Sequence, residues 1–88
     1  MMFGVDGFVL DMENEAQRAR GVHGRFHSAH EAYAVLLEEL DEFWQEVKRK
    51  EPDADAMYRE LVQVAAMALC AALECATPAA SDGEERER

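Results

Sequence analysis

Residues 30–50 constrain the fold of this chain more than any other stretch of the sequence. The apolar side chains in this stretch recur at steps of three and four residues, which is the spacing of one face of an α-helix. They are Tyr33, Leu36, Leu37, Leu40, Phe43, Trp44 and Val47. Just before them, Ser28 and Glu31 have the S-x-x-E spacing of a capping box, a pair that accepts free backbone N–H groups at a helix start. The sequence therefore predicts one amphipathic helix from the serine to about residue 49, with Lys48, Arg49 and Lys50 in its last turn, where cations suit the helix dipole.

A second long helix is predicted after a turn at Pro52, from about Ala54 to Cys75. Ten successive residues of this helix, 64–73, carry no polar side chain. A helix that is apolar all the way round is buried on every side, and an 88-residue chain with two other helices is too small to cover it alone. We therefore expect a homo-oligomer, a homodimer or a homotetramer, whose core includes this helix.

The N-terminal part of the chain predicts a shorter helix, from about Asp6 to Arg20, which Gly21 would end. A loop over residues 21–27 would follow it. The short turn at Pro52 makes the two long helices antiparallel neighbours. The expected fold is therefore all-α, an antiparallel helical hairpin plus a shorter N-terminal helix, which assembles into an oligomeric helical bundle. We expect a single helical domain over residues 1–76 and a disordered acidic tail over residues 77–88, which show no apolar periodicity.

The charge balance limits the partners of the chain. It has 19 acidic and 9 basic residues and a net charge of −10, which argues against nucleic acid or an anionic membrane surface as a partner. The N-terminus has no basic segment followed by a long apolar one, as a secretory signal would, and no apolar run reaches the roughly 18 residues of a membrane span. Cys70 and Cys75 are too far apart on one helix to pair with each other. Reduced cysteines are typical of a cytoplasmic protein, and we expect that location.

Acidic residues lie beside the apolar stripe of the first long helix. Glu39 and Glu42 are three residues apart, so their carboxylates lie one turn apart and repel each other unless a cation binds. Glu60 and Gln63 have the same spacing on the second long helix, where a buried carboxylate needs a partner. Counted outward from the turn, the two pairs lie at similar distances, so antiparallel helices would bring the four side chains together. Their oxygen atoms are the ligands that hard cations such as Mg²⁺ prefer.

The order of these acidic residues resembles the motifs of a known family. The string EELDE, residues 38–42, is followed by a gap of 17 residues and then by Glu60-x-x-Gln63. This is similar to the EExxE, spacer and ExxD motifs of the MazG-like all-α nucleoside triphosphate pyrophosphohydrolases. The lead-in SAHEAYAVLLEE and the segment ELVQVAAMA also look like the small stand-alone bacterial and phage members of that family. The resemblance covers about residues 22–75.

The resemblance implies hydrolysis of a nucleoside or deoxynucleoside triphosphate to the monophosphate and pyrophosphate, with Mg²⁺, or Mn²⁺ in its place, as the cofactor. By position it implies that Glu39, Glu42 and Glu60 are the metal ligands. Glu38 would support them, and the four glutamates would be the catalytic residues. Gln63 stands where the family has an aspartate. Its amide oxygen can still coordinate a cation, but it brings no charge, so we expect weaker metal binding.

Other interpretations of these residues stay open. Lys48 and Arg59 are candidates for contact with a substrate phosphate, but each is equally explained as a solvated or helix-end cation. Trp44 could stack on a nucleobase only if it left the core face. The acidic residues could form a plain solvated face, in which case the chain is a non-catalytic acidic helical oligomer that acts as a protein-interaction module. His23, His27 and His30 have the spacing of a zinc site only on a continuous helix, which the intervening glycine and the serine cap argue against.

Overall fold

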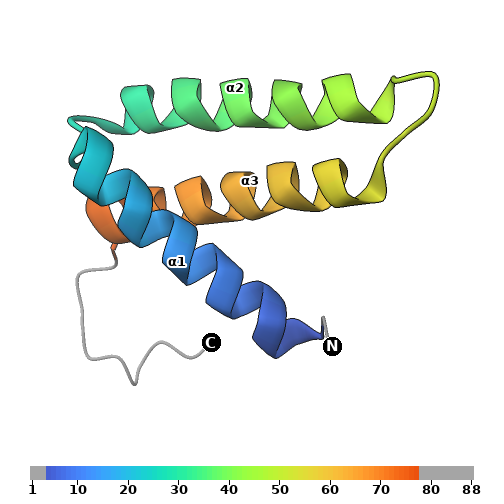
Figure 1. Ribbon diagram of the computed structural model, residues 1–88. Coiled ribbons are helices and arrows are strands. Elements are labelled where there is room, and N and C mark those ends of the chain that lie inside the picture. The colour runs from blue at the N-terminus through green and yellow to red at the C-terminus, as the bar shows by residue number, and fades with distance from the viewer. Residues whose placement is uncertain (1–3, 78–88) are drawn as a thin grey trace, which may run out of the picture.

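The computed structural model describes residues 4–77, which form three α-helices and no strand. The helices are α1, Val5–His23, α2, Ala29–Val47, and α3, Ala54–Cys75. In Figure 1, α2 and α3 lie side by side and α1 crosses α3 at an angle. Because α3 packs against both other helices, it forms the centre of the fold. The prediction of an all-α chain is confirmed.

The two long helices begin where the sequence predicts, because each has a side-chain cap. Ser28 Oγ accepts the backbone N–H of Glu31 at 3.1 Å. Glu31 Oε1 in turn accepts the N–H of His27 at 2.6 Å, so the glutamate reaches one residue beyond the cap. Asp53 Oδ1 accepts the N–H of Asp55 at 3.0 Å and caps α3. The predicted bounds of α3, residues 54 and 75, are confirmed.

The first helix is longer than predicted, because Gly24 rather than Gly21 ends it. Gly24 has a φ of 78°, a left-handed conformation that glycine adopts without a steric penalty. Its N–H donates to the carbonyl of Arg20 at 3.0 Å, which closes the last turn. Gly21 lies within the helix, where a glycine costs about 1 kcal/mol but does not by itself stop the helix. The prediction of a helix end at Gly21 was therefore wrong.

The second helix is shorter than predicted and ends at Val47. Lys48, Arg49 and Lys50 therefore lie in the connection to α3 and not in the last helical turn. The Arg49 N–H bonds to the Glu46 carbonyl at 3.3 Å, a three-residue step that tightens the end of the helix. The chain thus begins its reversal earlier than the position of Pro52 alone suggests.

The core of the described chain is thin and built mainly from alanine. Its buried hydrophobic residues are Ala16, Ala19, Ala32, Ala56, Val62, Ala66, Met67 and Cys70. On α2, by contrast, Tyr33, Leu37, Leu40 and Trp44 have exposed fractions of 67%, 51%, 50% and 51%. The single chain therefore covers only part of the apolar stripe of α2 and leaves Trp44 half-exposed. The physical reason is that α1 packs against α3 rather than against α2, so α2 has one helical neighbour and cannot cover a stripe this wide.

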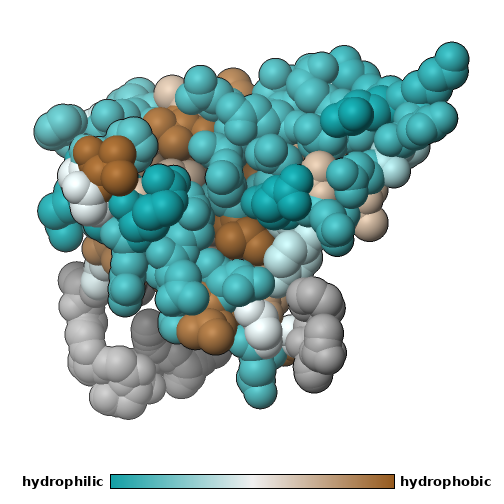
Figure 2. All heavy atoms as spheres, in the orientation of Figure 1, coloured by the Kyte–Doolittle hydropathy of each residue, from teal (hydrophilic) through white to brown (hydrophobic). Residues whose placement is uncertain are grey.

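The apolar run of α3 is also only partly covered. Ala68, Ala72 and Leu73 are exposed. Among the described residues α3 is long and apolar enough to cross a membrane, but core helices of soluble proteins pass the same test of length and composition. On the face seen in Figure 2, hydrophobic residues form small separate patches among hydrophilic ones. The chain alone therefore does not bury residues 64–73 on every side.

A partly buried ion pair joins the C-terminal ends of α1 and α3. Arg20 Nε lies 3.3 Å from Glu74 Oε2 and 3.2 Å from the thiol sulfur of Cys70. The other oxygen of Glu74 accepts the N–H of Phe26 at 2.9 Å, and the Arg20 guanidinium lies over the Phe26 ring. Cys70 and Cys75 are both free thiols, as predicted. This network holds the end of α1 and the following loop against α3.

Candidate metal centre

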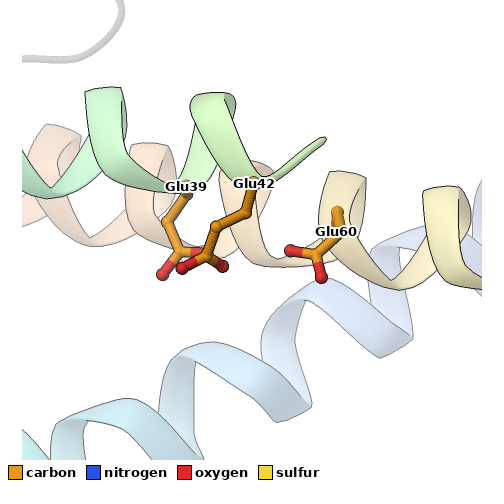
Figure 3. Close-up of side chains that lie close together, drawn as sticks. All are labelled: Glu39, Glu42 and Glu60. Carbon is orange, nitrogen blue, oxygen red and sulfur yellow. The ribbon is translucent and has the colours of Figure 1, made fainter. Parts of the chain in front are cut away.

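Three of the glutamates that the sequence singles out converge in space. Glu39 and Glu42 project from successive turns of α2, and Glu60 projects from the adjacent part of α3 (Figure 3). One carboxylate oxygen of each lies within 4.8 Å of the other two. Among residues 4–77 these glutamates, here called the acidic cluster, are the group of His, Cys, Asp or Glu side chains with the geometry to hold a metal ion.

Two carboxylate oxygen atoms of the acidic cluster are shielded from solvent. Within the described part of the chain, Glu39 Oε1 and Glu60 Oε1 are buried and have no hydrogen-bond partner. A buried polar atom without a partner loses its hydration and gains nothing in return, which costs about 1–3 kcal/mol or more when the group is charged. A proton or a bound cation would satisfy these atoms. Carboxylate oxygens at this spacing fit a hard divalent cation well.

The charges of the acidic cluster also favour a proton or a cation at these carboxylates. Burial, followed by the negative charges of Glu42 and Glu60, raises the pKa of Glu39 to about 7. Burial, followed by the charge of Glu42, also raises the pKa of Glu60. Without a cation Glu39 therefore keeps its proton to a higher pH than an ordinary carboxyl group does. A bound divalent cation would offset both causes and return the carboxyl groups to their ionised form.

Glu38 and Gln63 lie beside the acidic cluster. Both line the same pocket as Glu39, and the charge of Glu38 contributes to the raised pKa of Glu39. Glu38 is exposed, whereas Gln63 is half-buried. Gln63 thus shares a pocket wall with one member of the acidic cluster, and Glu38 lies on the solvent side.

The two predicted phosphate contacts have different positions. The ammonium of Lys48 lies 5.6 Å from the centre of the Trp44 ring, and Lys48 does not line the pocket that contains Glu39. Within residues 4–77 Lys48 forms no ion pair with a glutamate of the acidic cluster. Arg59 lines a second pocket together with Gln63, and its charge lowers the pKa of Glu60 against the larger opposing effects. Arg59 thus lies at the α3 end of the site.

Residues of α1 lie near the site, although the sequence does not predict this. A pocket of about 290 Å³ is formed by α1, α2 and α3, and its α1 wall includes Glu15, Arg18 and Arg20. Glu15 and Arg18 form an ion pair at 2.6 Å, and the three-residue spacing of this pair is visible in the sequence. The angle at which α1 crosses α3 has no such signal in the sequence.

The three histidines do not form a metal site in the described chain. His23 ends α1 and His30 lies in the first turn of α2. His27 lies between the helices, with its Nδ1 3.3 Å from a carboxylate oxygen of Glu31. The break between α1 and α2 thus interrupts the segment that contains the three histidines.

The chain was also compared with known protein families, with characterised proteins and with solved structures, and none of these comparisons found a match.

Proposed function

We propose that this protein is a Mg²⁺-dependent nucleotide pyrophosphohydrolase, which converts a nucleoside or deoxynucleoside triphosphate to the monophosphate and pyrophosphate. The observation that carries the proposal is the convergence of Glu39, Glu42 and Glu60, with two of their oxygens buried and unpartnered within residues 4–77. The resemblance of the motifs to those of the MazG-like pyrophosphohydrolases supports the choice of reaction. When bound, Mg²⁺ or Mn²⁺ neutralises phosphate charge and lowers the pKa of an attacking water.

The side chains of the chain have distinct roles in this proposal. Glu39, Glu42 and Glu60 hold the cation, and Gln63 adds a neutral oxygen ligand. Glu39 must lose its proton for the cation to bind, because only the ionised carboxylate is a good ligand. Arg59 contacts a substrate phosphate at the α3 end of the site, while Glu38 supports Glu39 from the solvent side.

The test is pyrophosphate release from a panel of canonical and modified nucleoside triphosphates, with Mg²⁺, with Mn²⁺ and with EDTA. We expect release from at least one nucleotide in the presence of either metal and none with EDTA. A folded protein that releases no pyrophosphate from any nucleotide would contradict the proposal. The chain would then be better described as an acidic helical oligomer that binds a protein partner, and Mg²⁺ should leave its thermal stability unchanged.

We further propose that the protein is a cytoplasmic homodimer or homotetramer, in which the antiparallel hairpin of α2 and α3 packs against another copy. The exposed apolar residues of α2, Tyr33, Leu37, Leu40 and Trp44, follow one another at steps of four, three and four residues. This is the spacing of a seam that packs against another helix. Monomeric proteins rarely expose a continuous apolar surface of this kind, and the thin alanine core of the single chain leaves further burial to be gained.

Replacing Leu40 with glutamate should dissociate the oligomer, because it puts a charge into the middle of this seam. We expect the mass measured by light scattering to fall to that of one chain, 9.9 kDa. The matched control is Gln45→Glu, which adds the same charge to an exposed position of α2 about 140° round the helix from Leu40. A wild-type protein that is already monomeric would contradict the oligomer, and equal dissociation by both variants would contradict the assignment of the seam.

A further inference from the structure

The pocket bounded by α1, α2 and α3 adjoins the acidic cluster at Glu39. Glu39 and Gln63 form part of its wall, and both side chains belong to the proposed metal site. Its volume, about 290 Å³, is at the lower end of the range of small-molecule sites. A ligand that binds the metal can therefore extend into this pocket, provided that it is no larger than a nucleoside.

The lining of the pocket suits a ligand with a flat, partly apolar body. Val35 of α2 and Met67 of α3 contribute apolar surface, and Phe26 contributes an aromatic ring. Charged side chains of α1 and α2 complete the wall. Most side chains of the wall are polar or charged, so the pocket suits a ligand that has polar edges as well as apolar faces, as a nucleobase with its sugar does.

Of the two arginines in the pocket wall, Arg18 is the more exposed, and two hydrogen bonds join it to Glu15. Arg20 is held by Glu74, and it also donates to the carbonyl of Gly24. The side chain of Arg18 is 56% exposed, and the ion pair that the structure gives it is the one with Glu15. The hydrogen bond and charge of Glu15 raise the pKa of Arg18, and the charge of Glu39 adds to this. Arg18 therefore lies in the field of the acidic cluster.

We propose that this pocket binds the base and sugar of the nucleotide, and that the guanidinium of Arg18 contacts the phosphate nearest the sugar. The inference rests on the proposed function, because it takes the phosphates to be held at the acidic cluster. A guanidinium is suited to this contact, since its planar donors match two phosphate oxygens and it stays charged at every physiological pH. Arg18 would exchange its contact with Glu15 for one with the phosphate, so α1 would supply substrate recognition to a site built on α2 and α3.

The test uses Arg18→Ala together with a matched control, Arg49→Ala. Arg49 forms an ion pair of the same three-residue spacing with Glu46, and the two arginine side chains are almost equally exposed, 56% and 58%. Arg49 does not line the pocket. The probe is the α,β-methylene analogue of the best substrate, or of ATP if no nucleotide is hydrolysed. It is titrated in Mg²⁺ against both variants and the wild type, with binding followed by calorimetry and by amide chemical shifts.

We expect Arg18→Ala to weaken binding of the analogue about tenfold, which corresponds to about 1.4 kcal/mol, and Arg49→Ala to leave it unchanged. In the wild type the amide signals of Arg18, Phe26 and Val35 should shift on binding. With a true substrate, Arg18→Ala should raise KM by a similar factor with little change in kcat, since the contact exists before the reaction begins.

The possible results distinguish failure of this inference from failure of the proposed function. Binding that shifts Glu39, Glu42 and Glu60 but not Arg18 or Val35, with equal affinity in both variants, would overturn the inference and leave the proposed function standing. Absence of both nucleotide binding and pyrophosphate release would overturn the two together.

Discussion

Replacing Glu60 with glutamine should reduce pyrophosphate release at least about 100-fold, a loss of about 2.7 kcal/mol of transition-state stabilisation. The amide has nearly the shape of the carboxylate but carries no charge, so the proposed metal site would keep two anionic ligands, Glu39 and Glu42, instead of three. Gln63 already brings no charge to the site, and a second neutral ligand leaves little attraction for a divalent cation. Glu42→Gln should have the same effect for the same reason.

When no metal is present, the Glu60→Gln variant should be at least as stable as the wild type, although its activity falls. Glu60 has a buried oxygen without a hydrogen-bond partner in the described chain, and the charge of Glu42 adds to the raised pKa that burial causes. An amide removes the repulsion and can donate a hydrogen bond to a neighbouring carboxylate. We therefore expect the Tm in EDTA to be equal to or above that of the wild type, which would show that lost activity is not lost folding.

The control for both variants is Asp41→Asn. Asp41 lies within the same acidic string on α2, but it is exposed and is not part of the acidic cluster. We expect its activity and Tm to match those of the wild type. Full activity in Glu42→Gln and Glu60→Gln would contradict the assignment of the site. A similar loss of activity in all three variants would show that overall negative charge matters rather than the geometry of the cluster.

The sequence predicts the helix starts best, because each depends on capping residues that are close by in the chain. The start of α2 depends on Ser28 and Glu31, and that of α3 on Asp53, and each cap acts within four residues of itself. The sequence does not predict the end of α1 correctly, because Gly21 and Gly24 are both glycines and either could end the helix. Only the φ of 78° at Gly24 distinguishes them, and that angle depends on how the end of α1 packs against α3.

The acidic cluster was largely predictable, whereas its surroundings were not. Glu39, Glu42 and Glu60 follow from two helical spacings and a short turn, which together place residues at equal distances from the turn beside each other. The crossing of α1 over α3 depends on small buried residues such as Ala16, Ala19 and Ala66, which have no pattern that specifies an angle. Arg18 and the pocket therefore became visible only in the structure, as did the exposure of the stripe on α2.

The metal-free protein should lose stability as the pH rises from about 4.5 to about 7. Burial and neighbouring charges raise the pKa of Glu39 from its usual 4.5 to about 7 in the folded chain. Across this range the folded state binds more protons than the unfolded state, so the free energy of unfolding falls with rising pH and levels off above pH 7. Because Glu39 is partly exposed and screened by solvent, we expect a loss of about 1–2 kcal/mol.

The measurement is urea unfolding in EDTA between pH 5 and pH 8, at one fixed protein concentration, for the wild type and Glu39→Gln. The glutamine variant cannot titrate at this position, so its stability should depend less on pH. Some dependence should remain, because the pKa of Glu60 is also raised. Equal pH dependence in the two proteins would show that Glu39 ionises as an ordinary surface carboxylate, and the case for a buried acidic cluster would fail.

Repeating the urea unfolding with Mg²⁺ in place of EDTA should make the wild type more stable, rather than less stable, as the pH rises. A cation that binds the ionised carboxylates stabilises the folded state more as their protons are lost, so the gain in stability from Mg²⁺ should grow through pH 7, where Glu39 titrates. Glu39→Gln should show a smaller gain at every pH, since one anionic ligand is missing. A wild type that gains no stability from Mg²⁺ at pH 8, where all three carboxylates are ionised most fully, would rule out the acidic cluster as a cation site and with it the proposed reaction.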